Sequence, residues 1–293
     1  MKYLVIDIGG SYVKYALMDE DNNFLIKDKF KTPQNGRDEL VEAIGKLYDS
    51  NTDIKAISIS MPGIINPNKG YVYMGGALSY NNDFYFKDAL EKRCNNIPIY
   101  INNDAKCAAT CEAKVGALKD VQDGMVIILG TMVGGGIILN HQVRVGKHFS
   151  AGETSYLITD KDAYPSKQII WGNRCSALRL CRDFAYRKGM NTNEVGGEMV
   201  FKAVNEGDKD AIDSLEQYTK EIAVQIFNIQ TFLDVETFAI GGGISAQAAL
   251  IDGIKKHLDK MYEVSPYYVP KAKVVRCKFG NDANLIGALQ YAL

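Results

Sequence analysis

Three glycine-rich turns, each after an apolar strand-like run, constrain the fold more than any other feature of this sequence. They are the segments Asp7–Ser11 (DIGGS), Gly130–Gly136 (GTMVGGG) and Gly241–Ser245 (GGGIS). Glycine lets backbone N–H groups crowd around an anion, because no side chain blocks the approach and positive φ is tolerated. One such turn is more often only a tight turn, but three together indicate a phosphate site. Neither the Walker-type phosphate loop nor the six-residue dinucleotide fingerprint is present, which indicates a different nucleotide-binding architecture.

Alternating strand and helix patterns predict an α/β protein. The chain opens with a hairpin at Tyr3–Leu17, joined by Gly9-Gly10-Ser11, and its first 115 residues have the predicted element order βββαβαβα. The second half opens similarly, because strand Met125–Leu129 precedes the turn at 130–136 and a strand at Ile137–Asn140. This is a weak internal repeat of the hairpin. No linker-like stretch separates the halves, so we expect two lobes that share a cleft.

Composition and charge exclude several classes of partner. The chain has 293 residues, of which 46% are hydrophobic, enough for a large core. Its 34 basic and 35 acidic residues nearly cancel, which leaves no bulk field to attract nucleic acid or an anionic membrane. The longest charge-free stretch, residues 124–140, is interrupted by five glycines and fails as a membrane helix. We therefore expect neither a nucleic-acid nor a membrane partner.

The cysteines indicate a reducing compartment, and we expect a cytoplasmic protein. Six cysteines are spread along the chain without close metal-type spacing, which fits free thiols better than a disulfide framework. The three histidines, at positions 141, 148 and 257, have no metal-ligand spacing either.

Asp7 ends a strand otherwise made of Leu, Val and Ile, where an unpaired carboxylate is costly unless it faces a polar site. We interpret it as a water-mediated Mg²⁺ contact beside nucleotide phosphates. The alternative is a turn-capping aspartate that accepts local N–H bonds. Ser11 and Lys14 are candidates to assist with phosphate, although Lys14 is equally compatible with an exposed strand position.

Asp104 is the candidate general base. It lies in Asn102-Asn103-Asp104, between a predicted strand at 98–101 and a predicted helix at 104–115. An aspartate at a helix N-cap is ordinary, but near a phosphate site a carboxylate can orient an acceptor hydroxyl and take its proton. Glu153, after Ala151-Gly152, can bind sugar hydroxyls bidentately. Its alternative is a solvated loop acid.

Taken together, these motifs resemble the ROK family (repressors, open reading frames and sugar kinases) over essentially the whole chain. The matching segments are DIGGSYVKYAL at 7–17, SMPGIINPNKG at 60–70, INNDAKCAA at 101–109, LGTMVGGGIIL at 129–139, AGETSYL at 151–157, AIGGGIS at 239–245 and NLIGAL at 284–289. Their number and order make the resemblance specific.

The resemblance implies an ATP-dependent sugar kinase with a two-lobed fold of the actin and hexokinase type and an interlobe cleft. A smaller lobe at 1–115, completed by a C-terminal helix at 281–293, and a larger lobe at 116–280 are expected. Asp104 matches the family's catalytic base, and Asn103, Asp104 and Glu153 match ligands of the sugar hydroxyls. The implied nucleotide-binding residues are Asp7, Gly9, Gly10, Ser11, Lys14, Gly130, Thr131, Gly134, Gly135, Gly241, Gly242 and Gly243. A homodimer that uses ATP and Mg²⁺ is expected.

Departures from the family pattern concern the substrate. Tyr156 stands where the family often has histidine, and Tyr164–Gly172 has none of the cysteines of the family's zinc motif, so we predict no zinc. Tyr156, Gly63, Gly76 and the loop at 71–77 are expected to form the sugar end. The tyrosine at 156 combined with MGGA at 74–77 is similar to bacterial β-glucoside kinases, and zinc-free N-acetylmannosamine kinases are similar too. Met132, where glycine is usual, is expected to narrow the phosphate cradle.

Two other functions are weighed against the kinase. The family also contains sugar-responsive transcription regulators, but those carry an N-terminal DNA-binding domain, whereas the first strand here starts at residue 3. An inactive sugar-binding protein is favoured if Met132 prevents ATP binding. Glucose, N-acetylmannosamine, fructose and a disaccharide all stay open as acceptors, because one pocket substitution changes specificity by only about 1–3 kcal/mol.

Overall fold

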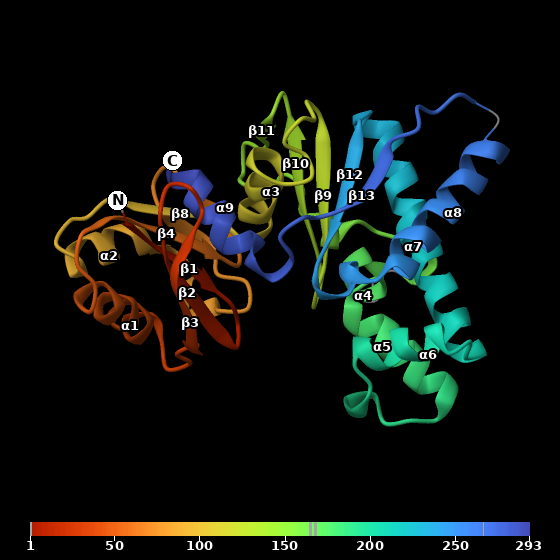
Figure 1. Cartoon of the computed structure of the whole chain (residues 1–293), viewed down its shortest axis with the longest axis horizontal. Coiled ribbons are helices and arrows are strands. Elements are labelled where there is room, and N and C mark those ends of the chain that lie inside the picture. The colour runs from red at the N-terminus through yellow and green to blue at the C-terminus, as the bar shows by residue number, and fades with distance from the viewer. Residues whose placement is uncertain (1, 164–165, 167–168, 266) are drawn as a thin grey trace. The chain divides into compact units, whose positions relative to one another are not determined.

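The computed structural model describes residues 2–163, 166, 169–265 and 267–293, which fold into two units (Figure 1). The first unit contains Met1–Val115, Val145–Ala151 and Asp282–Leu293. The second unit contains Gly116–Arg144 and Gly152–Asn281. This division places Val145–Ala151 in the first unit, whereas the sequence assigned that segment to the second.

A five-stranded sheet forms the centre of the first unit, with the strand order β3-β2-β1-β4-β8. β1, β2 and β3 are antiparallel neighbours, whereas β4 and β8 run parallel to β1. Apart from the partly buried Ile54, the apolar residues of β1 and β4 are buried, as expected for central strands covered on both faces. The bounds of the five strands are β1 Lys2–Ile8, β2 Tyr12–Met18, β3 Phe24–Lys31, β4 Ile54–Met61 and β8 Ile99–Asn103.

In the described part of the first unit, α-helices and a second, small sheet surround the central sheet. The helices are α1 Arg37–Asp49, α2 Phe86–Arg93, α3 Asp104–Lys114 and α9 Ala283–Ala292. The small sheet has the order β5-β6-β7, with β5 Ile64–Asn66, β6 Tyr71–Met74 and β7 Phe84–Tyr85. The segment at 71–77, interpreted above as a loop, therefore begins with a strand. Within this strand Val72 is buried, whereas Tyr73 and Met74 are exposed.

The C-terminal helix α9 packs among elements formed much earlier in the chain (Figure 1). Gly287 on α9 lies so close to the carbonyl of Cys107 on α3 that a Cβ atom would overlap it. Ser58 of β4 donates a hydrogen bond to the carbonyl oxygen of Ala288 at 2.6 Å. Residues 282–293 are therefore an integral part of the core of the first unit.

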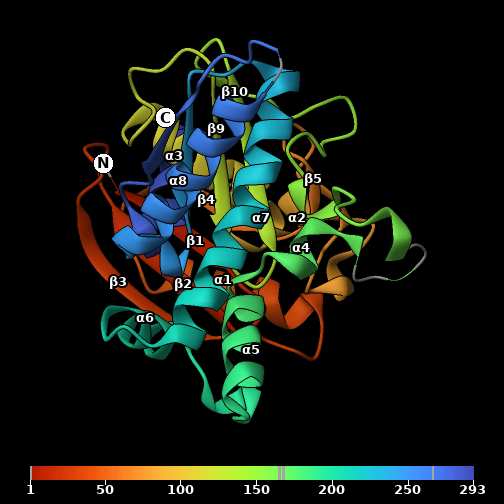
Figure 2. The same ribbon diagram turned by 90° about the vertical axis from the view of Figure 1, so that its right-hand side faces the viewer.

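The second unit is built on a sheet with the order β11-β10-β9-β12-β13. Its strands are β9 Gly124–Leu129, β10 Val133–Leu139, β11 Gln142–Val143, β12 Thr237–Gly241 and β13 Lys273–Arg276. The helices are α4 Trp171–Arg174, α5 Ala177–Lys188, α6 Gly197–Asn205, α7 Lys209–Leu233 and α8 Ala248–Val264, and α7 lies alongside α8 (Figure 2). Among the described residues, no helix is long and apolar enough to cross a membrane.

The predicted turn at 130–136 is only partly correct. The turn itself is Gly130–Met132, and β10 already begins at Val133, so Gly134, Gly135 and Gly136 pair with β9 inside the sheet. Gly135 has no room for a side chain, because the carbonyl of Gly152 and the side chain of Thr154 pack against it. These glycines therefore allow close backbone packing within a strand.

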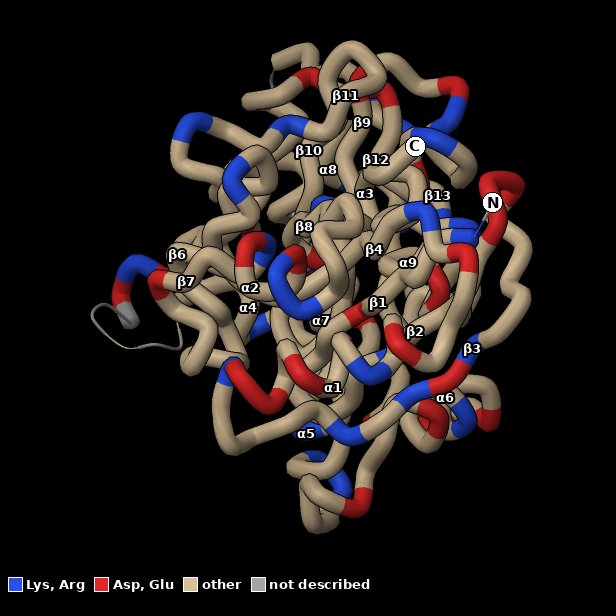
Figure 3. Tube along the Cα trace, turned by 90° about the vertical axis from the view of Figure 1, so that its left-hand side faces the viewer, with Lys and Arg blue, Asp and Glu red and all other residues tan. Residues whose placement is uncertain are grey.

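Charged residues protect the edge of the first unit's sheet. The edge strand β3 carries Lys27, Asp28, Lys29 and Lys31, and opposite charges alternate along it (Figure 3). Such charges discourage edge-to-edge pairing with another chain.

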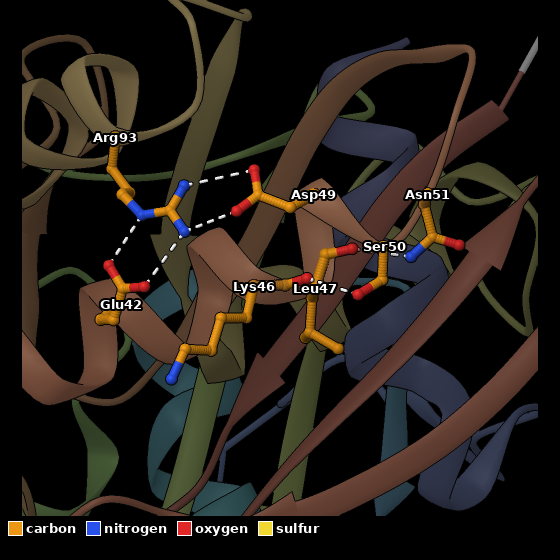
Figure 4. Close-up of polar contacts among 7 residues, drawn as sticks. All are labelled: Glu42, Lys46, Leu47, Asp49, Ser50, Asn51 and Arg93. Atoms are coloured by element: carbon orange, nitrogen blue, oxygen red, sulfur yellow. Dashed lines mark hydrogen bonds and ion pairs between the residues drawn. The ribbon is translucent and has the colours of Figure 1, made fainter.

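Arg93 ties α2 to α1 through two carboxylates (Figure 4). Its guanidinium donates to Glu42 from Nε at 2.7 Å and to Asp49 from Nη2 at 2.6 Å. Gly45 on α1 lies under this side chain, where a Cβ atom would overlap the guanidinium. These hydrogen bonds lower the pKa of both carboxyl groups and raise the pKa of Arg93.

Candidate active site

Asp7 is held at the end of β1 by side chains from three other elements. Its Oδ1 accepts hydrogen bonds from Ser60 Oγ on β4 and from Asn284 Nδ2 on α9, both at 3.0 Å. Lys14 Nζ on β2 contacts Oδ2 at 3.4 Å. Asp7 is only 6% exposed, and its donors come from distant elements, a pattern different from the turn-capping alternative. The carboxylate is therefore fixed in orientation.

The carbonyl groups of the first glycine turn accept hydrogen bonds from side chains that follow β3. Thr32 Oγ1 donates to the carbonyl of Gly9 at 2.6 Å, and Gln34 Nε2 donates to the carbonyl of Gly10 at 3.1 Å. In a trans peptide the N–H points opposite to the C=O. The amides of Gly10 and Ser11 therefore point away from Thr32 and Gln34, and both residues are exposed. This arrangement suits an anion.

The structure separates the roles of Asn103 and Asp104. Asn103 is the N-cap of α3, because its side chain accepts a hydrogen bond from the amide of Lys106 at 3.2 Å. Asp104 is the first helical residue, and its Oδ1 accepts from Asn103 Nδ2 at 3.0 Å and from the amide of Ala105 at 2.8 Å. The N-cap alternative considered for Asp104 therefore belongs to its neighbour.

Gly63 and Gly76 lie beside this helix start. Asn103 Nδ2 also donates to the carbonyl of Gly63 at 2.9 Å. Gly63 has φ +114°, and a Cβ atom there would overlap the carbonyl of Met74. Gly76 has φ +58° and lies against Pro62 and Gly63. The structure therefore brings Asn103, Asp104, Gly63 and Gly76 together in the first unit.

Asp7 and the start of α3 lie at the same end of one sheet, where the parallel strands β1, β4 and β8 have their carboxyl ends. In the strand register, Asp7 pairs with Ser60 and Ser60 pairs with Asn102. Two strand spacings separate Asp7 from Asn102, which is about 10 Å. The carboxyl ends of parallel strands in α/β sheets are the usual place for a ligand. Ser60, Asn102 and Asn284 thus join the site residues predicted from the sequence.

In the second unit, the turn at 130–132 is anchored to neighbouring elements. Gly130 donates its amide to the carbonyl of Met132 at 3.0 Å, and its own carbonyl accepts from the amide of Ala177 at 2.9 Å. Thr131 is exposed. The side chain of Met132 ends beside Gly172 on α4. Met132 is therefore turned toward α4, in contrast to the expected narrowing of the cradle.

Glu153 directly precedes a short 3₁₀ turn at Thr154–Tyr156, and Tyr156 is its last residue. The preceding Gly152 has φ +79° and packs against Gly135 of β10. Ser155 Oγ donates to the carbonyl of Val133 at 2.8 Å, which fixes the turn to the sheet. Glu153 is partly buried, whereas Tyr156 is 63% exposed.

The third glycine turn follows β12. A Cβ atom on Gly241 would meet Ile128 Cδ1 at 2.6 Å, and one on Gly242 would overlap the carbonyl of Leu129. Gly242 has φ +97°, a conformation that favours glycine. Gly243 is exposed and begins a 3₁₀ turn at Gly243–Ala246. The backbone is therefore drawn close to β9 at this turn.

The donor set around Asp7 fits Mg²⁺ held through water. Mg²⁺ keeps most of its waters and takes one or two carboxylates, and Asp7 supplies one carboxylate in a fixed orientation. Among the described residues, no three His, Cys, Asp or Glu side chains gather as a metal cluster. The predicted absence of zinc rests partly on residues 164–165 and 167–168, which lie outside the described residues.

These two α/β units have the fold of the actin and hexokinase type, as the sequence predicted. The ROK family model matches residues 3–293, so the chain belongs to the ROK family. It is similar to the β-glucoside kinase of Klebsiella pneumoniae, with 28% identity over 292 residues that cover 99% of this chain and 96% of the relative.

Two solved structures extend the comparison. The Lmo2764 protein from Listeria monocytogenes is 26% identical, with a TM-score of 0.90 over 99% of this chain and 98% of that one. A ROK family protein from Streptococcus pneumoniae TIGR4, solved in complex with sucrose, is also 26% identical, with a TM-score of 0.89 over 99% and 97%. The family resemblance drawn from the motifs is thereby confirmed.

Proposed function

We propose that this protein transfers the γ-phosphoryl group of ATP to a sugar hydroxyl. The proposed acceptor is the 6-hydroxyl of a hexose, an N-acetylhexosamine or a β-glucoside. The observation that carries the proposal is the placement of Asp7 and Asp104 at the carboxyl ends of parallel strands in the first unit's sheet. One carboxylate serves the phosphates there and the other serves the acceptor. The β-glucoside kinase relative supports the same reaction class.

Each proposed site residue has a defined task. In the first unit, the amides of Gly10 and Ser11, with Lys14, bind phosphate oxygens, and Gly9 closes the turn through its hydrogen bond to the carbonyl of Tyr12. In the second unit, Thr131 approaches the phosphates on the turn that Gly130 begins, and Gly134 and Gly135 support this turn from β10. Gly241, Gly242 and Gly243 approach the adenosine. Asp7 would hold Mg²⁺ through water, and the bound ion would supply neutralisation of charge on the phosphates.

Asp104 takes the proton from the attacking hydroxyl as phosphoryl transfer proceeds. Its Oδ1 is oriented by Asn103 and by the amide of Ala105, so the carboxylate keeps one geometry. Asn103, Glu153, Tyr156, Gly63 and Gly76 bind the rest of the sugar. We expect the enzyme to work in the cytoplasm as a homodimer.

The test is an ADP-release assay across hexoses, N-acetylhexosamines and β-glucosides. Asp104→Asn is expected to lose about 10²-fold or more in kcat while it still binds sugar in calorimetry, because only proton transfer is removed. Asp88→Asn, which changes an exposed carboxylate on α2, is the matched control and should keep normal kcat. Near-normal turnover of Asp104→Asn would refute the base, and no ADP release with any sugar would refute the kinase.

A further inference from the structure

An aromatic platform covers one face of the small sheet in the first unit. We define it as Tyr71, Tyr73, Tyr85 and Phe149. Tyr71 on β6 is paired with Tyr85 on β7, and their ring centroids are 4.6 Å apart. Tyr71 also meets Tyr73 edge to face at 4.8 Å. The rings therefore form one continuous aromatic surface.

The platform stays open to solvent. Tyr73 is 46% exposed and Tyr85 is 51% exposed, although both rings are large and mostly apolar. The opposite face of β6 is closed, because Val72 is fully buried in the core. Contiguous exposed aromatic surface of this kind marks a binding site more often than scattered exposed residues do.

Phe149 is held on the platform at a conformational cost. Its ring stacks on Tyr73 with centroids 5.7 Å apart and an interplanar angle of 17°. Its backbone has φ +62°, which a bulky residue adopts only under constraint from its surroundings. The loop is closed by a hydrogen bond from the amide of Ala151 to the carbonyl of Val145 at 3.1 Å. Such strain is characteristic of functional positions.

The platform continues directly into the acceptor residues of the proposed site. Tyr73 precedes Met74, whose carbonyl lies against Gly63, and Gly63 accepts the hydrogen bond from Asn103 beside Asp104. Gly76 follows Tyr73 by three residues, at most about 11 Å of extended chain. Phe149 likewise precedes Glu153 by four residues. Two separate segments thus lead from the platform to proposed sugar ligands.

We infer that the aromatic platform is a subsite for the second ring of a disaccharide acceptor, the ring that is not phosphorylated. A pyranose presents polarised C–H bonds on its faces, and these are attracted to the negative face of an aromatic ring. Tyr71 OH contacts Asp83 Oδ1 at 3.3 Å at the border of the platform, and this carboxylate can accept hydroxyl hydrogen bonds. The inference rests on the proposed function and narrows its substrate class to glycosides larger than one ring.

One protein similar to this chain was solved with sucrose, a two-ring sugar, and another is named a β-glucoside kinase. Neither name assigns a role to any residue of the aromatic platform.

Kinetics with cellobiose and with glucose separate the platform from the rest of the site. Tyr73→Ala and Phe149→Ala are each expected to lower kcat/KM for cellobiose about 5- to 10-fold, mainly through KM, because stacking is made equally in ground and transition states. For glucose, kcat/KM should stay within about twofold of the wild type. Tyr73→Phe keeps the ring and should restore cellobiose kinetics. Tyr186→Ala removes an exposed tyrosine of the second unit and is the matched control.

Three outcomes of the variant experiments would overturn the inference. They are equal losses for both sugars, unchanged cellobiose kinetics, and a change in oligomeric state on Tyr73→Ala, which would mean that a second copy of the chain covers the platform. Calorimetry with cellobiose and glucose, without nucleotide, keeps the test independent of catalysis. If the wild type releases no ADP with any sugar, the kinase proposal fails, while weaker cellobiose binding by Tyr73→Ala still supports the platform. Absence of cellobiose binding by the wild type also overturns it.

Discussion

The two units share one sheet topology, but equivalent positions are polar or charged in the first unit and apolar or glycine in the second. Both sheets place an antiparallel hairpin beside parallel strands in the same order. Gly9 bonds to the carbonyl of Tyr12 and Gly130 bonds to the carbonyl of Met132, so the two turns correspond. Two residues before these glycines are Asp7 in the first unit and Ile128 in the second.

The neighbouring strands repeat this contrast. Asp7 pairs with Lys14 and Ser60, both polar, whereas Ile128 pairs with Gly134 and Gly241, which have no side chains. The first sheet therefore has a fixed carboxylate among polar side chains at a position where the second sheet has an apolar isoleucine between two glycines. The same sheet topology thus positions a charged side chain in the first unit and closely packed backbone in the second.

The largest effect is expected when the charge of Asp7 is removed. Asp7→Asn keeps the shape of the side chain and an acceptor for Ser60 and Asn284, but it loses the charge. We expect a loss of about 10²- to 10³-fold in kcat/KM for Mg-ATP, because the ion is no longer oriented. The matched change Ile128→Val at the equivalent position should cost less than about threefold. Steady-state kinetics over a Mg²⁺ titration decide this, and an unchanged Mg²⁺ dependence would remove Asp7 from the mechanism.

Substitutions in the third glycine turn test whether the second unit needs the close packing of Gly242 against the backbone of Leu129. Gly242→Ala must fit a Cβ atom where the carbonyl of Leu129 lies, at φ +97°. We expect a loss of about 3 kcal/mol in the free energy of unfolding. Gly243→Ala has open space and no positive φ, so it should change stability by less than about 0.5 kcal/mol. Urea titrations of both variants are the measurement, and equal midpoints would contradict this account of the turn.

The cysteines report whether one unit opens before the other. Cys94 and Cys107 in the first unit and Cys175 in the second are buried, and burial raises the pKa of the Cys94 thiol to about 11. The pKa values of Cys107 and Cys175 are also raised, chiefly by burial. At pH 8 we expect Ellman's reagent to label native protein about 100-fold more slowly than unfolded protein. Peptide mapping of partly labelled protein would show which unit reacts first, and immediate labelling of a thiol would contradict its burial.

Arg93 provides the smallest expected effect, confined to the first unit. The pKa values of Glu42 and Asp49 are lowered by their hydrogen bonds to Arg93, so the stabilisation is present at neutral pH and lost as the pH falls through the folded-state values. Arg93→Met should lower Tm by about 2 °C at pH 7, because exposed ion pairs contribute little. This difference should shrink below about pH 4, where the carboxylates become protonated. A difference that is constant with pH would indicate that packing over Gly45 dominates instead.

The sequence was sufficient for features that depend on local pattern. The family, the fold class and both hairpins follow from apolar runs and glycine motifs. It was insufficient where tertiary packing decides. Gly134–Gly136 were assigned to a turn because glycine usually marks one, but the nearby carbonyl of Gly152 makes glycine necessary in a strand.

The small sheet and part of the candidate site were missed for a different reason. β5, β6 and β7 have three, four and two residues, too few for a strand period to be recognised. Asn284 donates to Asp7 across 277 residues, and no local signal connects them. The motif NLIGAL at 284–289 contained the signal, but its role depends on where α9 packs.

The placement of α9 has a consequence for synthesis of the protein. The strands that carry Asp7 and Ser60 leave the ribosome early, yet Asn284 and the partner of Ser58 belong to the last helix of this sequence. The nascent first unit must therefore wait, with its polar centre incomplete, until the whole second unit has been translated. The Asp7 carboxylate can therefore reach its final orientation only once residues 283–292 have left the ribosome.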